Sequence, residues 1–510
     1  MFKSILFETD IDNLNTTGTV DAPKFFVDLH LDRIIETVIA GNQEPNLKPL
    51  FYTALKDIQN INYRQEIFQD LENTVLLERI KSFSHKMTIM QQHLALINKL
   101  QYKRHKEGWF LEAVDVYCEA VNCLVNDLQG INARGLLAFQ KYLNNYSQTA
   151  DFKMLCEITR KLRTELSNVE YCLLIKGSSV KVRKRESEID FSQEVERTFE
   201  KFKQGQVTDY TVKLSPDEGM SHVEAEILGK VAKLYPDVFG SLNNFCKQHL
   251  NYLDEEISNF YREIQFYIAF QDYITKLKKA GLKFCYPQIA VEQKDIFSYE
   301  GFDLALAQKS IGENSASIVC NDFYLEGKER TIILSGPEQG GKSTFARAFG
   351  QMHYLARLGC PVPGSKARLL LTDNIYVLFE KEEDIKDLHS KLEDDLIRIY
   401  KILNLATSNS IILIDRIFSS TTLKDAIFLS KKIMERLKQL DVLCVWISSI
   451  EESAGFSNNT VSMVSSIISD NPMLRTYKIV RKPAGGPSYA ISIADKYRVT
   501  YDWIKGRIKS

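Results

Sequence analysis

The chain has 510 residues, too many for a single hydrophobic core, and this length suggests about three domains. Hydrophobic residues make up 44% of the sequence and charged residues 26%, which is typical of a soluble globular protein. The formal net charge of -1 excludes a strongly basic field over the whole molecule, so any surface that binds nucleic acid must be a local patch.

The cysteines and the N-terminus indicate the cellular compartment. Nine cysteines are scattered singly without a Cys-x-x-Cys pair, which argues against a zinc site or a disulfide framework and fits a reducing cytosol. Acidic residues appear too early after Met1 for a signal peptide, and no apolar run approaches transmembrane length. We therefore expect a cytoplasmic protein with no membrane partner.

The first half of the sequence has a helical pattern that is interrupted once. Between about residues 24 and 175, apolar residues recur at spacings of three and four, and glycine and proline are sparse. At about residue 176 a glycine turn precedes alternating valine and basic residues, which predicts an exposed strand. A charged helical segment is expected at 190–205 and a second short strand at 210–214. Helices resume at about residue 220 and end at Gly281 and Pro287.

This order predicts the domain organisation. Two long helical stretches flank a small strand-bearing insert, which suggests two antiparallel arms with a small domain at their tip; a plain helical bundle with a surface hairpin is the alternative. After residue 287 strands alternate with helices, as in an α/β domain. The predicted parts are an N-terminal segment 1–23, a helical region 24–175, an insert 176–220, returning helices 221–287 and an α/β domain 288–510.

A glycine-rich loop in the last part carries the strongest functional signal. The apolar run 331–334 precedes it, a helix is expected at 344–358, and the loop has the G-x-x-x-x-G-K-S pattern of phosphate-binding loops. Its residues are Gly336, Pro337, Glu338, Gln339, Gly340, Gly341, Lys342, Ser343 and Thr344. Backbone amides would surround phosphate oxygens, Lys342 would reach the terminal phosphates, and Ser343 would hold Mg²⁺. A chance match in a glycine-rich turn is the alternative, but the flanking strand and helix favour ATP and Mg²⁺.

A second element of this site follows later in the chain. The apolar run 411–414 predicts a buried parallel strand, and Asp415 at its end fits the carboxylate that holds the Mg²⁺ shell. The spacing between Gly336 and Asp415 leaves no room for the very long coiled coil of chromosome-maintenance ATPases. The transporter signature L-S-G-G-Q is also absent.

Several segments together carry a family pattern. The loop is similar to the pattern G-P-N-M-G-G-K-S-T, and residues 359–363 are similar to G-x-x-V-P. Residues 414–417 stand where the same pattern has M/L-D-E-I. Further similar segments are 61–65 (I-x-x-R-Q), 320–325 and 489–494 (S-Y-x-x-x-V-A). Residues 388–390, Leu-His-Ser, fall where the family has its G-x-S loop. On these residues the sequence resembles the MutS family of DNA mismatch-repair ATPases, from about residue 24 to 504.

The resemblance implies a multidomain fold and specific partners. It implies an α-helical core and lever with a small β-containing clamp insert, followed by an α/β P-loop ATPase domain that is completed by a second subunit. The implied partners are DNA, bound without sequence preference, and a second copy or a paralogue, in the bacterial cytoplasm or nucleoid. Ser390 would touch the partner subunit's nucleotide. As an alternative that can coexist, Ser390 would cap a helix together with Glu393.

The resemblance also assigns the basic strand of the insert to DNA. The candidate DNA-binding residues are Lys181, Arg183, Lys184 and Arg185. Such bases would meet phosphates and give a salt-dependent affinity that is independent of sequence. The alternative is a solvated strand face with no ligand.

Three departures from the family pattern matter for function. The helical core begins by about residue 24, so we expect a short form that lacks the mismatch-recognition and connector domains. Arg416 occupies the usual position of the glutamate that polarises the attacking water, and a guanidinium, with a pKa above ~12, cannot accept a proton. Ser448 and Ser449 replace the Thr-His pair that would sense the γ-phosphate. The catalytic residue is therefore unknown, and we expect slow or absent hydrolysis.

The sequence thus leaves three functional hypotheses. The leading one is an ATP-regulated clamp that binds mismatched, branched or otherwise structured DNA in repair or recombination. The alternative from another class is a catalytically inactive nucleotide-binding scaffold that recruits protein partners. A third is an active ATPase that uses another acid in place of Arg416.

Overall fold

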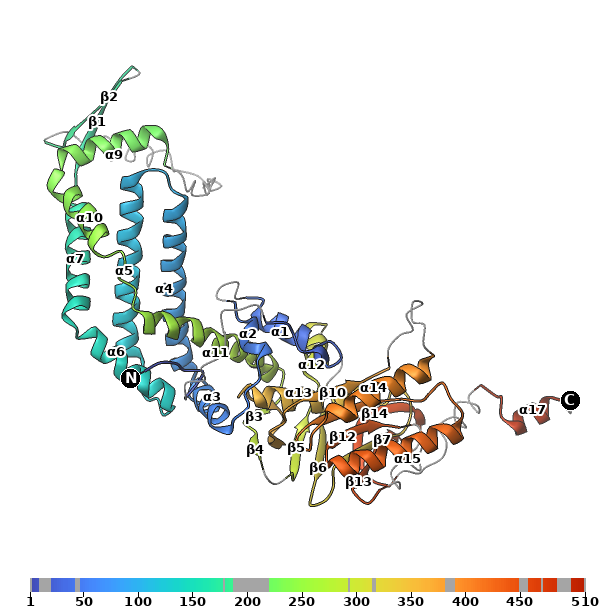
Figure 1. The fold of residues 1–510 in the computed structure, drawn as a ribbon. Helices are drawn as coiled ribbons and strands as arrows, with labels where there is room; N and C mark the ends of the chain where they lie inside the picture. The colour runs from blue at the N-terminus through green and yellow to red at the C-terminus, as the bar shows by residue number, and fades with distance from the viewer. Residues whose placement is uncertain are drawn as a thin grey trace. The chain divides into compact units, whose positions relative to one another are not determined.

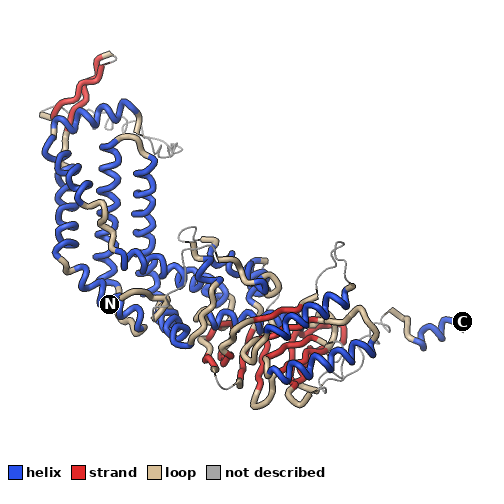
Figure 2. Tube along the Cα trace, in the orientation of Figure 1, coloured by secondary structure: helices blue, strands red, loops and turns tan. Residues whose placement is uncertain are grey.

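The computed structural model of the chain contains two compact units, shown in Figure 1. Residues 1–3, 73–131 and 136–261 form one, here called the helical unit, and residues 4–72, 132–135 and 262–510 form the other, the α/β unit. Figure 2 shows that strands are concentrated in the α/β unit. The structure describes residues 2–8, 20–41, 46–177, 179–186, 220–291, 294–313, 318–380, 390–448, 457–468, 471–483 and 497–508.

The helical unit is built on long amphipathic helices. Helix α5 (Lys103–Asp127) packs along α4 (Thr74–Lys99) and also contacts α7 (Ala150–Ser167) and α10 (Pro236–Gln248). Residues of α5 at spacings of three and four are buried, which explains why the helical period in the sequence predicts this region correctly. The other helices with residues in this unit are α6 (Arg134–Ser147), α9 (His222–Leu234) and α11 (Glu255–Lys279).

A two-stranded hairpin follows α7. Strands β1 (Tyr171–Lys176) and β2 (Ser179–Lys184) pair antiparallel, and β2 contacts α9 (Figure 1). The prediction of helix up to residue 175 is therefore wrong for 171–175, whose aromatic and branched residues pair with β2 instead. Gly177 at the turn has a φ of 62°, which glycine adopts without steric cost. The helix predicted at 190–205 and the strand predicted at 210–214 lie outside the described residues.

The α/β unit contains a six-stranded sheet in the order β10-β11-β12-β7-β13-β14. All neighbouring pairs are parallel except β13 and β14. The predicted buried strand that ends at Asp415 is present as β11 and lies beside β12. The strand bounds are β7 Thr331–Ser335, β10 Ile375–Leu378, β11 Ile411–Asp415, β12 Leu443–Ile447, β13 Thr460–Ile468 and β14 Asn471–Arg481.

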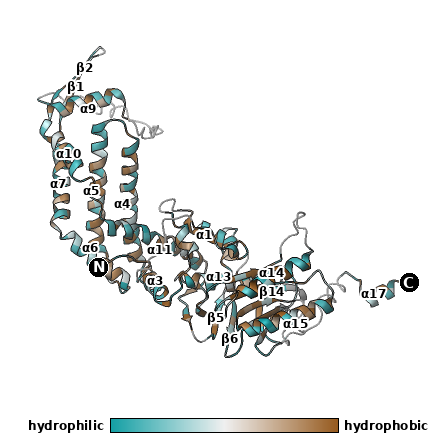
Figure 3. Cartoon of the chain, viewed as in Figure 1, coloured by the Kyte–Doolittle hydropathy of each residue, from teal (hydrophilic) through white to brown (hydrophobic). Residues whose placement is uncertain are grey.

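Helices cover both faces of this sheet. Helices α14 (Lys391–Leu405) and α15 (Leu423–Leu440) pack on Ile412, Ile414 and Trp446, while α13 (Lys342–Arg357) contacts β11 and β12. Burial on two faces explains the continuous apolar runs of β11 and β12, and Figure 3 shows hydrophobic residues along these central strands. Helix α13 is itself buried over 12 of its 16 residues.

A smaller sheet of four strands, in the order β4-β9-β5-β6, completes the α/β unit. Its strands are β4 Gln288–Ala290, β5 Ile296–Gly301, β6 Asn321–Leu325 and β9 Lys366–Leu370, and a separate pair joins β3 Phe284–Cys285 to β8 Val362–Pro363. The remaining helices are η1 Lys24–Phe26, α1 Leu31–Ile39, α2 Lys48–Tyr52, α3 Ile58–Asp70, α12 Leu304–Gly312 and α17 Tyr501–Ile508. Within the described ranges, no helix has the length and apolarity needed to cross a membrane.

The far end of α13 is tied to segments from the beginning of the chain. Arg64 of α3 is fully buried and donates hydrogen bonds to the carbonyls of Leu6 and Leu358 at 3.1 Å each. Tyr354 Oη donates to the Phe51 carbonyl at 2.8 Å. The motif at 61–65 therefore has a structural role here. The predicted order of a helical region followed by an α/β domain is confirmed, while the domain ranges and the clamp assignment of the insert stay predictions.

Candidate functional site

The phosphate-binding loop lies between β7 and α13, where the sequence places it. Gly336 has a φ of 111°, and Gly341, the residue before the first turn of α13, has a φ of 89°. Residues other than glycine rarely adopt these backbone angles. Gly340 lies against Ser465 of β13, whose Oγ donates to the Gly340 carbonyl at 2.6 Å. The glycine spacing of the motif therefore meets specific backbone and contact requirements.

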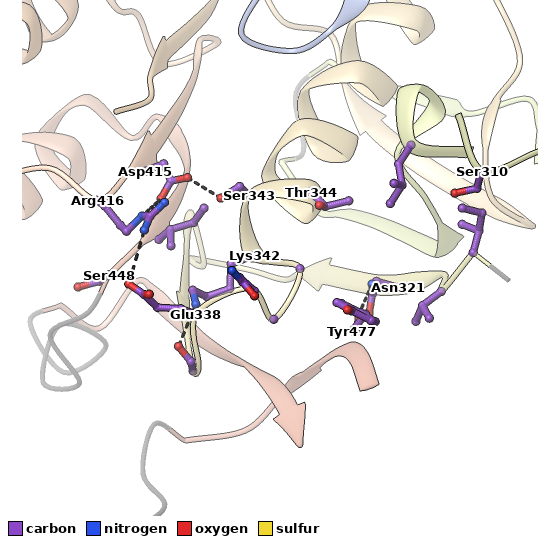
Figure 4. A pocket seen from close by; sticks show the side chains of 18 residues that line it. Ser310, Asn321, Glu338, Lys342, Ser343, Thr344, Asp415, Arg416, Ser448 and Tyr477 are labelled. Carbon is purple, nitrogen blue, oxygen red and sulfur yellow. Dashed lines mark hydrogen bonds and ion pairs between the residues drawn. The ribbon is translucent and has the colours of Figure 1, made fainter. Parts of the chain in front are cut away.

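Lys342 and Ser343 begin α13, and Figure 4 shows Ser343 linked to Asp415 at the end of β11. Lys342 Nζ donates to the carbonyls of Gly336 at 2.9 Å and Pro337 at 2.5 Å. Burial lowers the pKa of Lys342, and the charge of Arg416 lowers it further. Ser343 Oγ donates to Asp415 Oδ2 at 2.6 Å, and Asp415 is only 5% exposed. The predicted Mg²⁺ residues are thus in direct contact.

Arg416 leaves β11 in a strained conformation. Its φ of 50° lies in the left-handed region, where a residue with a side chain costs about 1 kcal/mol or more. Its amide donates to the Ile447 carbonyl at 3.2 Å, and its guanidinium lies 3.3 Å from Asp415 Oδ1. Two further carboxylates, of Glu338 and Glu380, lie within ion-pair distance. The side chain therefore stays at the nucleotide loop, surrounded by acidic groups.

These residues surround a cavity of about 680 Å³, within the usual range for small-molecule sites of about 300–1,000 Å³. The cavity brings together most of the predicted loop residues with Asp415 and Arg416. Pro337 takes part through its carbonyl. The lining residues are Leu306, Ser310, Ile318, Val319, Asn321, Gly336, Glu338, Gln339, Gly340, Gly341, Lys342, Ser343, Thr344, Asp415, Arg416, Ile447, Ser448 and Tyr477.

Sequence reasoning missed Tyr477 and the role of Asn321. Tyr477 of β14 is half exposed, has a φ of 55° and lies beside Gly341. Asn321 of β6 donates from Nδ2 to the Tyr477 carbonyl at 3.1 Å (Figure 4) and accepts from the Ile479 amide at 2.7 Å. Residues 320–325 had a family-like pattern, but only the β13–β14 hairpin reveals what they contact. The aromatic ring gives the cavity a surface suited to a planar base.

The donor set fits Mg²⁺ and a phosphate chain. A hydroxyl and a carboxylate, Ser343 and Asp415, are hard oxygen ligands of the kind that Mg²⁺ takes together with substrate phosphates. Lys342 Nζ donates to two loop carbonyls, at the place where anionic oxygens would compete for it. The backbone amides at the N-terminus of α13 add a favourable site for an anion.

The other residues predicted near the nucleotide have mixed positions. Ser448 lines the cavity, and its amide donates to the Leu334 carbonyl at 3.0 Å. Ser390 is the N-cap of α14 and accepts from the Glu393 amide at 3.3 Å; it is not among the described lining residues. Its contact with a partner subunit stays a prediction. Ser449, residues 388–389 and residues 489–494 lie outside the described residues.

The four candidate DNA-binding residues are on or next to β2, but not on one face. Lys181 and Arg183 share one face of the strand, while Lys184 shares the other with Val182. Lys184 Nζ lies 4.8 Å from the ring centre of Tyr235, and Arg185 lies 3.6 Å from Glu170. Lys181 and Arg185 are exposed. Their role in DNA binding stays a prediction.

Comparisons with known proteins address the same region. Residues 332–505 match the family described as MutS domain V. A DNA mismatch repair protein MutS from Carboxydothermus hydrogenoformans is 27% identical over 226 residues, covering 44% of this chain and 26% of that protein. The Endonuclease MutS2 of Thermus thermophilus is 28% identical over 215 residues, covering 40% and 29%.

A eukaryotic relative gives the same picture. The DNA mismatch repair protein MSH3 of Yarrowia lipolytica is 24% identical over 293 residues, covering 55% of this chain and 28% of that protein. The chain thus spans little more than a quarter of the length of these curated relatives. The resemblance is confirmed: residues 332–505 match MutS domain V, and the chain is similar to DNA mismatch repair proteins over about half of its length.

Proposed function

We propose that the chain is an ATP-binding protein that engages DNA as an ATP-regulated clamp and hydrolyses ATP slowly or not at all. The observation that carries this is the composition of the cavity. Lys342, Ser343 and Asp415 form a complete phosphate and Mg²⁺ side, whereas Arg416 stands beside them at the usual position of a water-polarising carboxylate. A general base contributes about 10²–10⁴-fold in rate, so its replacement slows turnover strongly.

In this proposal each group has a defined task. The loop amides and Lys342 bind the phosphates, Ser343 and Asp415 hold Mg²⁺, and the ring of Tyr477 packs on the base. The metal supplies charge neutralisation between the terminal phosphates. Lys181, Arg183, Lys184 and Arg185 contact DNA phosphates, and Ser390 reaches the nucleotide of a second subunit. Support for DNA as the partner comes from two relatives, which are named as DNA mismatch repair proteins.

The test is nucleotide-dependent DNA binding by the full chain at a stated salt concentration. Duplex, mismatched and branched DNA are titrated without nucleotide, with ADP and with ATP, and Lys342→Ala serves as the control. We expect ATP to change the affinity for at least one DNA structure, and Lys342→Ala to abolish the change. The proposal is overturned if ATP alters the affinity for none of them.

Two alternatives give different results in the same set of measurements. For a nucleotide-binding scaffold, ATP raises the melting temperature of the wild type but not of Lys342→Ala, and no DNA binds in any state. For an active ATPase, phosphate release exceeds the Lys342→Ala background and is lost in Asp415→Ala. Residual turnover at background level excludes this second alternative.

A further inference from the structure

Arg416 lies at the centre of an ion cluster on the edge of the nucleotide cavity. Its guanidinium lies 3.3 Å from Asp415 Oδ1, 3.7 Å from Glu338 Oε1 and 3.9 Å from Glu380 Oε2. These carboxylates come from the end of β11, the phosphate-binding loop and the segment after β10. Figure 4 shows the Arg416 side chain between Asp415 and Glu338.

Glu338 is an unfavourable residue for a loop that surrounds phosphates. Its side chain is 82% exposed and lines the cavity, where its negative charge would repel an anionic ligand. The pattern that the loop resembles has asparagine here, and glutamate at the position of Arg416. The two departures have opposite charges and lie against each other across the cavity edge. Each therefore compensates the other while no anion is bound.

An incoming phosphate changes this balance. The Arg416 side chain is 45% exposed, so its present ion pairs are solvent-screened and can be exchanged at low cost. A guanidinium presents a planar fork of donors that matches phosphate oxygens. It binds a phosphate more strongly than it binds an exposed carboxylate. The strained backbone of Arg416 is of the kind that persists at functional sites.

The position of Arg416 also selects which phosphate it meets. In sites of this type, the residues that would hold Mg²⁺ lie on the side of the terminal phosphates. Arg416 directly follows Asp415, the carboxylate that bonds Ser343 on the Mg²⁺ side. Its fork would therefore meet the terminal phosphate of a bound triphosphate, which a diphosphate lacks.

We propose that Arg416 binds the terminal phosphate and distinguishes a nucleoside triphosphate from a diphosphate, with Glu338 as its counter-ion in the empty site. This inference rests on the proposed nucleotide binding. Arg416 then replaces a catalytic function with a sensing one. On binding of a triphosphate, the guanidinium leaves Glu338 for the terminal phosphate.

The test compares the affinities of the full chain for Mg²⁺ with a non-hydrolysable ATP analogue and for Mg²⁺ with ADP, by titration calorimetry. Because a charge-assisted hydrogen bond contributes about 1.5–3 kcal/mol, we expect Arg416→Gln to weaken analogue binding about tenfold or more and ADP binding less than about threefold. Arg416→Lys restores part of the loss. Glu338→Gln strengthens analogue binding, since it removes a competing carboxylate.

Controls separate this inference from the proposed function. Arg436→Gln changes an exposed arginine of α15 whose Nη1 bonds Gln439, and it leaves both affinities unchanged. The inference is overturned if the wild type binds both nucleotides and Arg416→Gln lowers the affinities for the ATP analogue and for ADP equally. It is also overturned if Arg416→Gln lowers neither affinity. If the wild type binds neither nucleotide and behaves like Lys342→Ala, it is the proposed function that fails.

Discussion

The phosphate-binding loop and the β1–β2 hairpin are both proposed to meet phosphates, and they are built in opposite ways. The loop is concave and glycine-rich, and its lysine is held by two carbonyls in a cavity. The hairpin is a two-stranded ribbon whose basic side chains alternate between its faces.

This difference teaches how each region should respond to change. In the loop, backbone amides and side chains are fixed around one position, so the affinity for nucleotide depends on geometry. A single substitution there should therefore remove most of this affinity. On the hairpin each charge acts through the ion atmosphere of the ligand, so contributions are small, additive and sensitive to salt. Substitutions in the two regions can therefore test whether the distinction holds.

Removal of the loop lysine should have the largest effect. Lys342→Ala deletes the cation that lies in the cavity, and charge-assisted bonds of about 1.5–3 kcal/mol each predict a loss of nucleotide affinity on the order of 100-fold. Titration calorimetry with ATP and Mg²⁺ measures it. A loss of less than about threefold would show that the loop does not act as a unit.

The next largest effect should come from adding one methyl group to the loop. In Gly340→Ala the new Cβ would collide with Ser465 Oγ and lie 3.0 Å from the Pro337 carbonyl oxygen. Overpacking costs about 1–3 kcal/mol, which predicts roughly a tenfold or larger loss of nucleotide affinity. The matched control is Gly229→Ala in α9, where nothing lies within 4 Å, and it should bind nucleotide normally.

On the hairpin, a single lysine should matter less and in a different way. Lys181→Ala removes one exposed charge from β2, and we expect a two- to fivefold weaker DNA affinity and a salt-dependence slope smaller by about 1. Fluorescence anisotropy across a salt series gives both values. A loss as large as that of Lys342→Ala for nucleotide would contradict the comparison.

The smallest effect should come from the arginine that already has an acidic neighbour. Arg185 lies 3.6 Å from Glu170, so its charge is partly compensated before any DNA binds. Arg185→Ala should therefore change DNA affinity by less than about twofold, in line with the small energies of exposed ion pairs. Glu170→Gln should raise the affinity slightly, because it frees this charge.

Local patterns were sufficient for the parts of the fold in which one segment decides its own structure. The loop motif and the apolar strand before Asp415 each lie within one short segment. The approach of Ser343 to Asp415 was also predictable, because parallel strands present their carboxyl ends at one edge of a sheet.

Features that depend on distant segments could not be predicted in the same way. Tyr477 reaches the cavity only because β14 turns back antiparallel to β13, and Asn321 fixes its backbone from the other sheet. The pairing of Glu338 with Arg416 depends on a left-handed backbone at Arg416, which the sequence does not reveal. In the case of β1, pairing with β2 overrode the helical pattern that precedes it.

Helix α13 gives the α/β unit a mechanical property. It starts at the phosphate-binding loop, runs for 16 residues or about 24 Å, and is enclosed on nearly all sides. Its opposite end is held through Tyr354 by the Phe51 carbonyl, and the Leu358 carbonyl just beyond it accepts from buried Arg64. A rod packed in this way cannot bend or slide without repacking its surroundings. Any movement of the loop when a nucleotide binds would therefore displace the contacts of α13 with α3, a full helix length from the phosphates.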